Sequence, residues 1–281
     1  MVASVLASIE DTLVSSAGDI REILLDRGYT AEYNPSGEQQ LAADTAADHL
    51  LEKRCSEITG IGQYASEERK TVQDIGTGVS VAVDPLDGSS NLKSNNPMGT
   101  IVSVYEEALP APSSALLGAW YVLYGPITTM VSLRDGDVTE AVIADGSILH
   151  RKPVSIPEEP TIYGVGGRSP DWPPVVDNLV ESFEQSLKLR YGGAMVADVN
   201  QVLTYGGIFS YPALESAPDG KLRLQFEAIP VGAIITAAGG AASNGFNAIS
   251  QLSPETLHER TPMYVGNQSL IADVESAHST A

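Results

Sequence analysis

Residues 79–92 read VSVAVDPLDGSSNL, an apolar run that leads into two acidic residues and a turn. Valine at alternate positions, with small residues between, predicts a buried strand up to Val83. Pro85 has no N–H group, so we expect the strand to end there. Asp84 would then lie at the carboxyl end of the strand, and Asp87 would return beside it across a tight turn.

The residues after this strand offer two kinds of ligand. The carboxylates of Asp84 and Asp87 and the carbonyl of Leu86 are oxygen ligands of the kind that Mg²⁺ prefers. Backbone N–H groups and hydroxyls that suit a phosphate come next, from Gly88, Ser89, Ser90 and Asn91. A metal site beside a phosphate site suggests metal-assisted phosphoryl chemistry. Pro-x-Asp-Gly is also an ordinary β-turn signature, and most such turns bind nothing.

Residues 84–91, DPLDGSSN, resemble the signature of class I fructose-1,6-bisphosphatases, part of the wider superfamily that includes the inositol monophosphatases. Further resembling stretches follow in the family's order between residues 34 and 266. The resemblance implies an α/β (α+β layered) sugar-phosphatase fold with alternating helix and sheet layers, αβαβα. It also implies one unit of two packed halves, residues 1–155 for the metal and 160–281 for the substrate phosphates.

The resemblance implies metal ligands from several separate segments. It adds Glu67 and Glu227 to Asp84, Asp87 and the Leu86 carbonyl. These groups would hold two or three Mg²⁺ ions, with Mn²⁺ as an alternative. Paired glutamates such as those in Ser-Glu-Glu are by themselves mostly surface residues, so this assignment depends on the resemblance.

Catalytic residues are implied by the same comparison. Glu38 and Asp44 match acidic positions that help to activate the attacking water, and Glu68 would assist in the proton and metal network. Asp44 and Asp48 lie four residues apart and share one helical face. A solvated face is the commoner explanation of such a pair when it stands alone.

Residues 220–227, GKLRLQFE, alternate between polar and apolar. We therefore expect a strand with Lys221, Arg223, Gln225 and Glu227 on one face. An edge strand that meets solvent would show the same pattern.

The resemblance gives the cationic and tyrosine side chains tasks in substrate binding. Lys221, Tyr191 and Tyr211 would hold the distal phosphate, and Arg223 would lie near the reacting end. Arg190 would reach the site of a neighbouring subunit, which implies a homodimer or homotetramer. Gly166 stands where many family members have a phosphate-binding asparagine.

Composition limits the partners of the chain. With 36 acidic and 16 basic residues among 281, the net charge of −20 argues against nucleic acid or an anionic membrane as partner. We found no bilayer-length apolar run and no leader, so we expect a soluble, cytoplasmic protein. Cys55, the sole cysteine, excludes an intramolecular disulfide. High negative charge with little lysine suggests adaptation to concentrated salt.

Other helices and strands are predicted from hydrophobic periodicity and from glycine and proline at their ends. We expect a helix over residues 4–26 that Gly28 ends, and a second helix that begins at Glu38. Hairpins are expected around Asp135-Gly136 and Asp145-Gly146. The remaining predictions are strands over 101–105, 117–123, 128–133, 138–143, 148–149 and 161–165, and helices from 173 and over 230–238.

The resemblance implies Mg²⁺-dependent hydrolysis of D-fructose 1,6-bisphosphate to fructose 6-phosphate and phosphate, a gluconeogenic step in which water attacks directly. Sedoheptulose-1,7-bisphosphatase and inositol monophosphatase are the alternatives with the same chemistry. A monophosphatase would not need the distal phosphate residues. A sugar-phosphate sensor is the alternative from another class, and it would be expected to lack a metal carboxylate. The resemblance places Thr77-Gly78 near the position of a Lys-Tyr pair that helps AMP-sensitive relatives to bind AMP, so we expect AMP inhibition at that site to be weak or absent.

Overall fold

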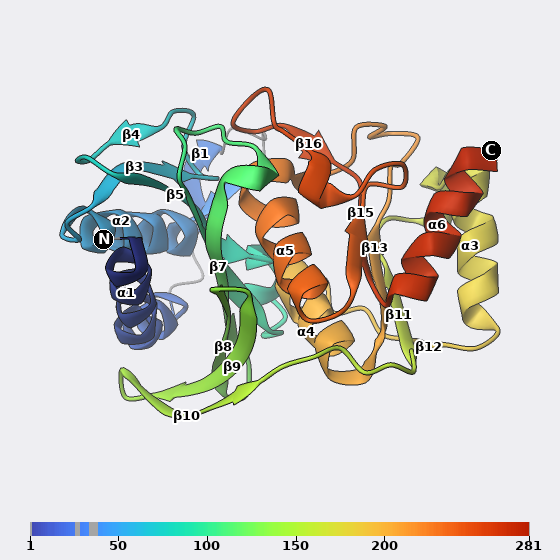
Figure 1. The fold of residues 1–281 in the computed structure, drawn as a ribbon, viewed down its shortest axis with the longest axis horizontal. Helices are drawn as coiled ribbons and strands as arrows, with labels where there is room; N and C mark the ends of the chain where they lie inside the picture. The colour runs from blue at the N-terminus through green and yellow to red at the C-terminus, as the bar shows by residue number, and fades with distance from the viewer. Residues whose placement is uncertain (1, 26–28, 34–38, 281) are drawn as a thin grey trace.

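The structure is a computed structural model that describes residues 2–25, 29–33 and 39–280 (Figure 1). Helices and sheets alternate in five layers: α1 with α2, a first sheet, α4 with α5, a second sheet, and α3 with α6. The helices are α1 (Val2–Ile23), α2 (Ala42–Ser56), α3 (Pro174–Glu184), α4 (Met195–Tyr205), α5 (Ile229–Ala237) and α6 (Gln268–Thr280). This stacking confirms the predicted αβαβα order of layers.

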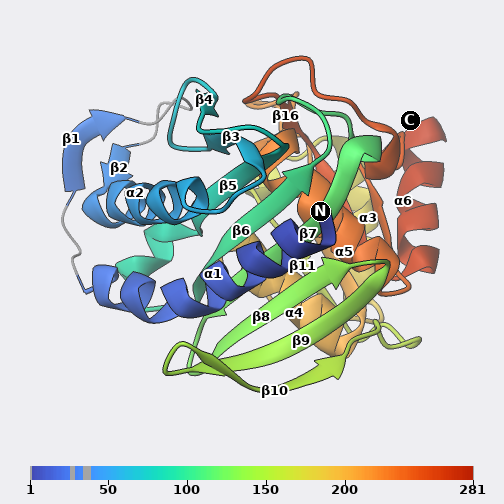
Figure 2. The ribbon, with the colours of Figure 1, turned by 60° about the vertical axis from the view of Figure 1, so that its left-hand side comes forward.

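The first sheet has eight strands in the order β10-β9-β8-β7-β6-β5-β3-β4. They are β3 (Ile61–Ser66), β4 (Gln73–Asp74), β5 (Val79–Asp87), β6 (Met98–Tyr105), β7 (Leu116–Tyr124), β8 (Thr128–Arg134), β9 (Asp137–Ala144) and β10 (Ser147–Pro153). Asp135-Gly136 and Asp145-Gly146 form the predicted hairpin turns, and each of these residues has the positive φ of a type I′ turn. Figure 2 shows α1 and α2 lying across one face of this sheet.

Strand β5 extends further than the sequence predicts. It continues through Pro85 to Asp87, with a shift of register after Asp84. Asp84 lies opposite Ile101, and Asp87 lies opposite Gly99. Proline is tolerated at such an irregularity because no regular ladder hydrogen bond is required there. The prediction that the strand ends at Pro85 is therefore wrong, and both acids lie on one irregular strand.

The second sheet has five strands in the order β12-β11-β13-β17-β15. They are β11 (Ile162–Val165), β12 (Lys188–Leu189), β13 (Gly207–Tyr211), β15 (Ala241–Ser243) and β17 (Met263–Gly266). Two small sheets pair β1 (Tyr29–Tyr33) with β2 (Gln39–Leu41), and β14 (Leu222–Arg223) with β16 (Arg260–Thr261).

Helix α2 begins later than predicted. Residues 39–41 form β2, so the helix starts at Ala42 and not at Glu38. The carboxylate of Asp44 accepts a hydrogen bond of 2.8 Å from the N–H group of Leu41, which stabilises the first turn. The predicted stop at Gly28 and the predicted residue Glu38 both lie outside the described residues.

The middle helices are enclosed by the two sheets. Helix α5 contacts β7 and β8 of the first sheet and β15 and β17 of the second. Apart from Thr236, its sequence is apolar all round, which follows from this burial on more than one side. Among the described residues, no helix combines the length and the apolar character needed to cross a bilayer.

Candidate active site

Strand β5 presents two buried carboxylates to the space between the sheets. Asp84 is 3% exposed and Asp87 is 6% exposed. One carboxylate oxygen of Asp84 accepts a hydrogen bond of 3.1 Å from the N–H group of Leu86, so the irregular end of the strand fixes the acid's orientation. Asp87 accepts a hydrogen bond of 2.7 Å from the N–H group of Val196 in the first turn of α4.

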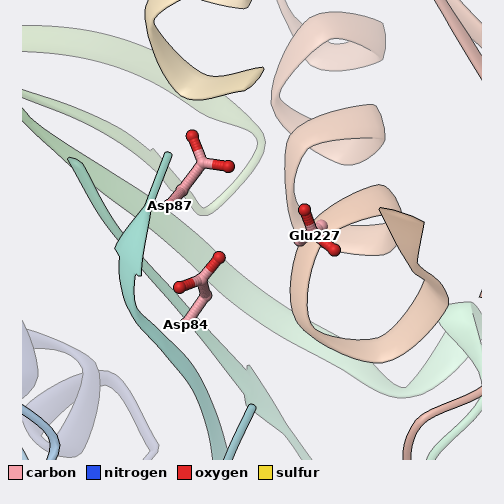
Figure 3. Close-up of side chains that lie close together, drawn as sticks. All are labelled: Asp84, Asp87 and Glu227. Carbon is pink, nitrogen blue, oxygen red and sulfur yellow. The ribbon is translucent and has the colours of Figure 1, made fainter. Parts of the chain in front are cut away.

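Glu227 faces these two acids from the other half of the chain (Figure 3). One oxygen from each of Asp84, Asp87 and Glu227 lies within 4.8 Å of the others. The predicted strand over residues 220–227 is wrong here, because β14 ends at Arg223 and residues Leu224–Ala228 form a π-helical turn, η4. Arg223 directly precedes this turn, and Glu227 lies inside it. The Glu227 carboxylate accepts a 2.5 Å hydrogen bond from the N–H group of Arg223, as a capping side chain does at the start of a helix.

Arg223 joins the acids of both halves. Its guanidinium lies 2.8 Å from Glu67 and 3.7 Å from Glu227. Glu67 follows β3 directly and shares a hydrogen bond with Asp84. Gln225 does not share the face predicted for it, because its side-chain oxygen accepts a hydrogen bond from the N–H group of Ala111 at 2.7 Å.

A cavity of about 130 Å³ collects most of the site residues predicted for the reacting end. Gly88 is in a left-handed conformation (φ 74°), and a side chain there would meet Cβ of Ala194 at 2.2 Å. The turn can therefore approach α4 only with glycine. The cavity is lined by Asp44, Glu67, Glu68, Asp84, Leu86, Asp87, Gly88, Ser89, Ser90, Arg223 and Glu227.

The electrostatics of this cavity fit a divalent cation. Burial, and then the charge of Glu67, raises the pKa of Asp84 well above its usual range. Burial and the charge of Glu227 raise the pKa of Asp87 to about 8. Glu67, Asp84, Asp87 and Glu227 line the cavity with Arg223, so acidic groups outnumber this buried cation. Closely spaced buried oxygen ligands with excess negative charge match what Mg²⁺ and Mn²⁺ bind.

The residues predicted for the distal phosphate lie outside this cavity. Tyr191 hydrogen-bonds to Tyr211, and burial raises the pKa of Tyr191 above its usual range, as do the charges of Tyr211, Asp198 and Asp87. Lys221 is exposed and acts electrostatically on Asp171. At Gly166, a side chain would meet the ring of Tyr211 at 2.7 Å, so the tyrosine ring lies directly against the glycine backbone.

Asn91 and Arg190 are engaged with other protein groups. The amide of Asn91 donates hydrogen bonds of 2.9 Å to the carbonyl groups of Pro97 and Gly192, and Asn91 does not line the cavity. Arg190 lies over the ring of Tyr205, with 4.7 Å from its guanidinium carbon to the ring centre.

Asp198 is a site residue that sequence analysis did not single out. Its carboxylate accepts hydrogen bonds from the N–H groups of Gly192 at 2.6 Å and Gly193 at 3.2 Å. It therefore fixes the turn that carries Tyr191. Burial raises the pKa of Asp198 to about 6. The signal that would have identified Asp198 is an acidic residue in the first turn of a helix that follows two consecutive glycines, Gly192 and Gly193.

Comparison with known proteins relates the whole chain to one family. Residues 2–148 match the model described as "Fructose-1-6-bisphosphatase, N-terminal domain", and residues 156–279 match the corresponding C-terminal domain. A "Fructose-1,6-bisphosphatase class 1" of Natronomonas pharaonis is 54% identical, over 98% of this chain and 99% of that protein. One from Halobacterium salinarum is 50% identical, over 98% of each.

Solved structures show the same fold. The fructose-1,6-bisphosphatase of Leishmania major in its holo form superposes with a TM-score of 0.86 at 27% identity, over 100% of this chain and 94% of that one. A putative sedoheptulose-1,7 bisphosphatase of Toxoplasma gondii gives a TM-score of 0.89 at 25% identity, over 98% and 94%.

Metal should stabilise the protein more strongly at higher pH. The pKa of Asp87 is raised to about 8 in the folded protein, compared with about 3.9 in an unfolded chain. The metal-free protein should therefore lose stability as pH rises between these values. Bound metal would compensate for the charge. The difference between the melting temperature in Mg²⁺ and the melting temperature in EDTA should therefore increase from pH 6 to pH 8.5. Asp198 titrates in both samples, so a gap that stays constant would contradict this expectation.

Proposed function

The chain belongs to the class 1 fructose-1,6-bisphosphatase family, and we propose that it hydrolyses D-fructose 1,6-bisphosphate to fructose 6-phosphate and phosphate. The observation that carries the proposal is the convergence of Glu67, Asp84, Asp87 and Glu227 on one small cavity. These acids come from both halves of the chain. We therefore propose that residues 1–155 and 160–281 act as one catalytic unit.

At the reacting end, the acidic residues would hold two or three Mg²⁺ ions, with Mn²⁺ as the alternative. The ligands would be Glu67, Asp84, the Leu86 carbonyl, Asp87 and Glu227. When bound, such ions offset the charge of the phosphoryl oxygens and make a water molecule more acidic. Gly88, Ser89 and Ser90 would bind the phosphate beside them, and Arg223 would offset the negative charge there.

The proton of the attacking water would pass to acids at the edge of the cavity. Asp44 and Glu68 line it, one from α2 and one from the turn after β3. Glu38 completes this set in the proposal. Direct attack by water needs no covalent intermediate, so these groups have only to orient the water and accept its proton.

The distal phosphate would be held by residues of the second half. Tyr191 and Tyr211 are hydrogen-bonded to each other, so one of the two hydroxyl protons is engaged there, and a bound phosphate would take one donor from each tyrosine in place of that bond. Lys221 and Asn91 complete the proposed substrate site, Asn91 by holding the Gly192 turn.

Arg190 is proposed to act in the site of a neighbouring subunit, so the working enzyme would be a homodimer or a homotetramer. Its stacking on Tyr205 and its 3.2 Å hydrogen bond to Gln201 hold the arginine against α4. An arginine held in this way loses less conformational freedom when it binds a partner's phosphate.

The acidic composition supports a further proposal, that the protein works in concentrated salt. A net charge of −20 on 281 residues implies self-repulsion of the folded chain. Salt screens such repulsion.

The activity can be tested by phosphate release from three substrates side by side: fructose 1,6-bisphosphate, sedoheptulose 1,7-bisphosphate and inositol 1-phosphate. We expect release from the first, dependent on Mg²⁺ and abolished by EDTA. Asp84→Asn should lower the rate by at least about 100-fold, since even outer partners of metal sites cost 10–100-fold. The control is Glu57→Gln, an exposed residue directly after α2. Release from neither bisphosphate would favour the sensor alternative.

The role of Arg190 can be tested by mixing two inactive variants. Arg190→Ala keeps the metal site, and Asp84→Asn keeps the arginine. If the arginine acts across an interface, each mixed dimer contains one complete site, so random mixing should restore roughly a quarter of wild-type activity. Activity that stays at the sum of the separate variants would show that Arg190 acts within its own subunit.

Salt adaptation can be tested by melting the protein in a series of KCl concentrations. Because screening weakens repulsion among acidic side chains, the melting temperature should rise with KCl up to molar concentrations. Full stability and activity in dilute buffer would refute the proposal.

A further inference from the structure

Arg69 lies two residues after Glu67 and binds helix α2 through its whole guanidinium group. Its Nε donates a hydrogen bond of 2.6 Å to Asp48, and its two terminal nitrogens each donate one of 2.7 Å to Glu52. Asp48 is 3% exposed and accepts a further hydrogen bond of 2.9 Å from the hydroxyl of Tyr64. Such a paired, bidentate contact fixes direction as well as distance.

The backbone of Arg69 is tied to the other half of the chain. Its carbonyl lies 2.7 Å from Nε2 of His258, in the segment before β16. A carbonyl can only accept, so this nitrogen carries the proton. The imidazole ring lies against Phe226, with 5.4 Å between the ring centres, and Phe226 directly precedes Glu227.

These contacts join the three segments that supply acids to the cavity. Asp48 is one helical turn after Asp44, Arg69 is two residues after Glu67, and Phe226 is one residue before Glu227. We propose that Arg69, assisted by His258, is a positioning residue that sets the spacing of the metal-binding carboxylates. This rests on the proposed metal-dependent function. In this role Arg69 contacts neither the substrate nor the metal and acts only through the segments that it joins.

The physical reason lies in the charge of the site. Without a bound metal ion, the ionised carboxylates of Glu67, Asp84, Asp87 and Glu227 face only the single cation of Arg223, and their mutual repulsion favours separation of the segments that carry them. The contacts of Arg69 are made outside the cavity, since Arg69 does not line it. They oppose separation without competing for the ligand oxygens. Loss of these contacts should therefore weaken metal binding more than it weakens substrate binding.

The test measures Mn²⁺ binding by calorimetry on the full chain without substrate. Arg69→Ala should raise the Kd for Mn²⁺ by about 10-fold or more, within the range found for outer partners of metal sites. Arg69→Lys keeps the positive charge but loses the planar, two-pronged guanidinium group, so the Kd for Mn²⁺ should rise by a smaller factor. His258→Phe keeps a ring against Phe226 and removes the N–H donor, so it should also raise the Kd.

Arg54→Ala is the matched control. Arg54 lies on α2, is buried to a similar extent, and binds Ser16 and Asp19 of α1 instead of the turn after β3. It should lower the melting temperature in EDTA but leave the Kd for Mn²⁺ within about 2-fold of wild type. In turnover at saturating Mn²⁺, Arg69→Ala should recover kcat, with the KM for fructose 1,6-bisphosphate unchanged.

Three results would overturn the inference: wild-type Mn²⁺ affinity in Arg69→Ala, an equal loss of affinity in Arg54→Ala, or no Mn²⁺ binding by the wild-type protein. Arg69→Lys keeps the test decisive if the alanine variant does not fold. The binding measurement needs no turnover. A shift in Kd without phosphate release would therefore support the positioning role while refuting the proposed reaction.

Discussion

Repulsion among buried carboxylates is the constraint on which the rest of the structure depends. Glu67, Asp84, Asp87 and Glu227 line a cavity of about 130 Å³, where little water can screen their charges. No single segment carries all of them. The fold has to hold four acids together before any metal ion binds, and the raised pKa values of Asp84 and Asp87 record how unfavourable their ionised forms are.

Rigid backbone opposes this repulsion. Each acid is close to a backbone N–H group or a cation that fixes it: Val196 for Asp87, Leu86 for Asp84, and Arg223 for both Glu67 and Glu227. The supports come from β5 of the first sheet, from β14 of a two-stranded sheet and from α4. Alternating layers therefore serve the chemistry directly, because they bring the ends of distant segments to one point.

Valine alternation, Asp-Gly turns and apolar helical stripes are local signals, and they predicted most of the strands and helices, whereas the order of the layers came from the resemblance to the family. The local signals failed where tertiary contacts override local preference. Pro85 does not end β5, because the irregular pairing with β6 accommodates it. Polar alternation from Lys221 to Glu227 does not give a strand beyond Arg223, because Leu224–Ala228 form a π-helical turn that brings Glu227 back to Arg223. The roles of Asp198 and Arg69 depend on contacts with other segments, and spacing along the chain cannot show these.

Two hydrogen bonds join residues 87–91 to the segment that carries Tyr191. The Asn91 amide donates one to the Gly192 carbonyl, and the Asp87 carboxylate accepts the other from the Val196 N–H group. The two ends of the proposed substrate site are thus attached to one another by hydrogen bonds between side chains of the one and the backbone of the other. They cannot drift apart to suit molecules of different length. Selectivity would then arise from the span between two anionic groups more than from the sugar hydroxyls, and a ligand with one such group would engage only half of the available contacts.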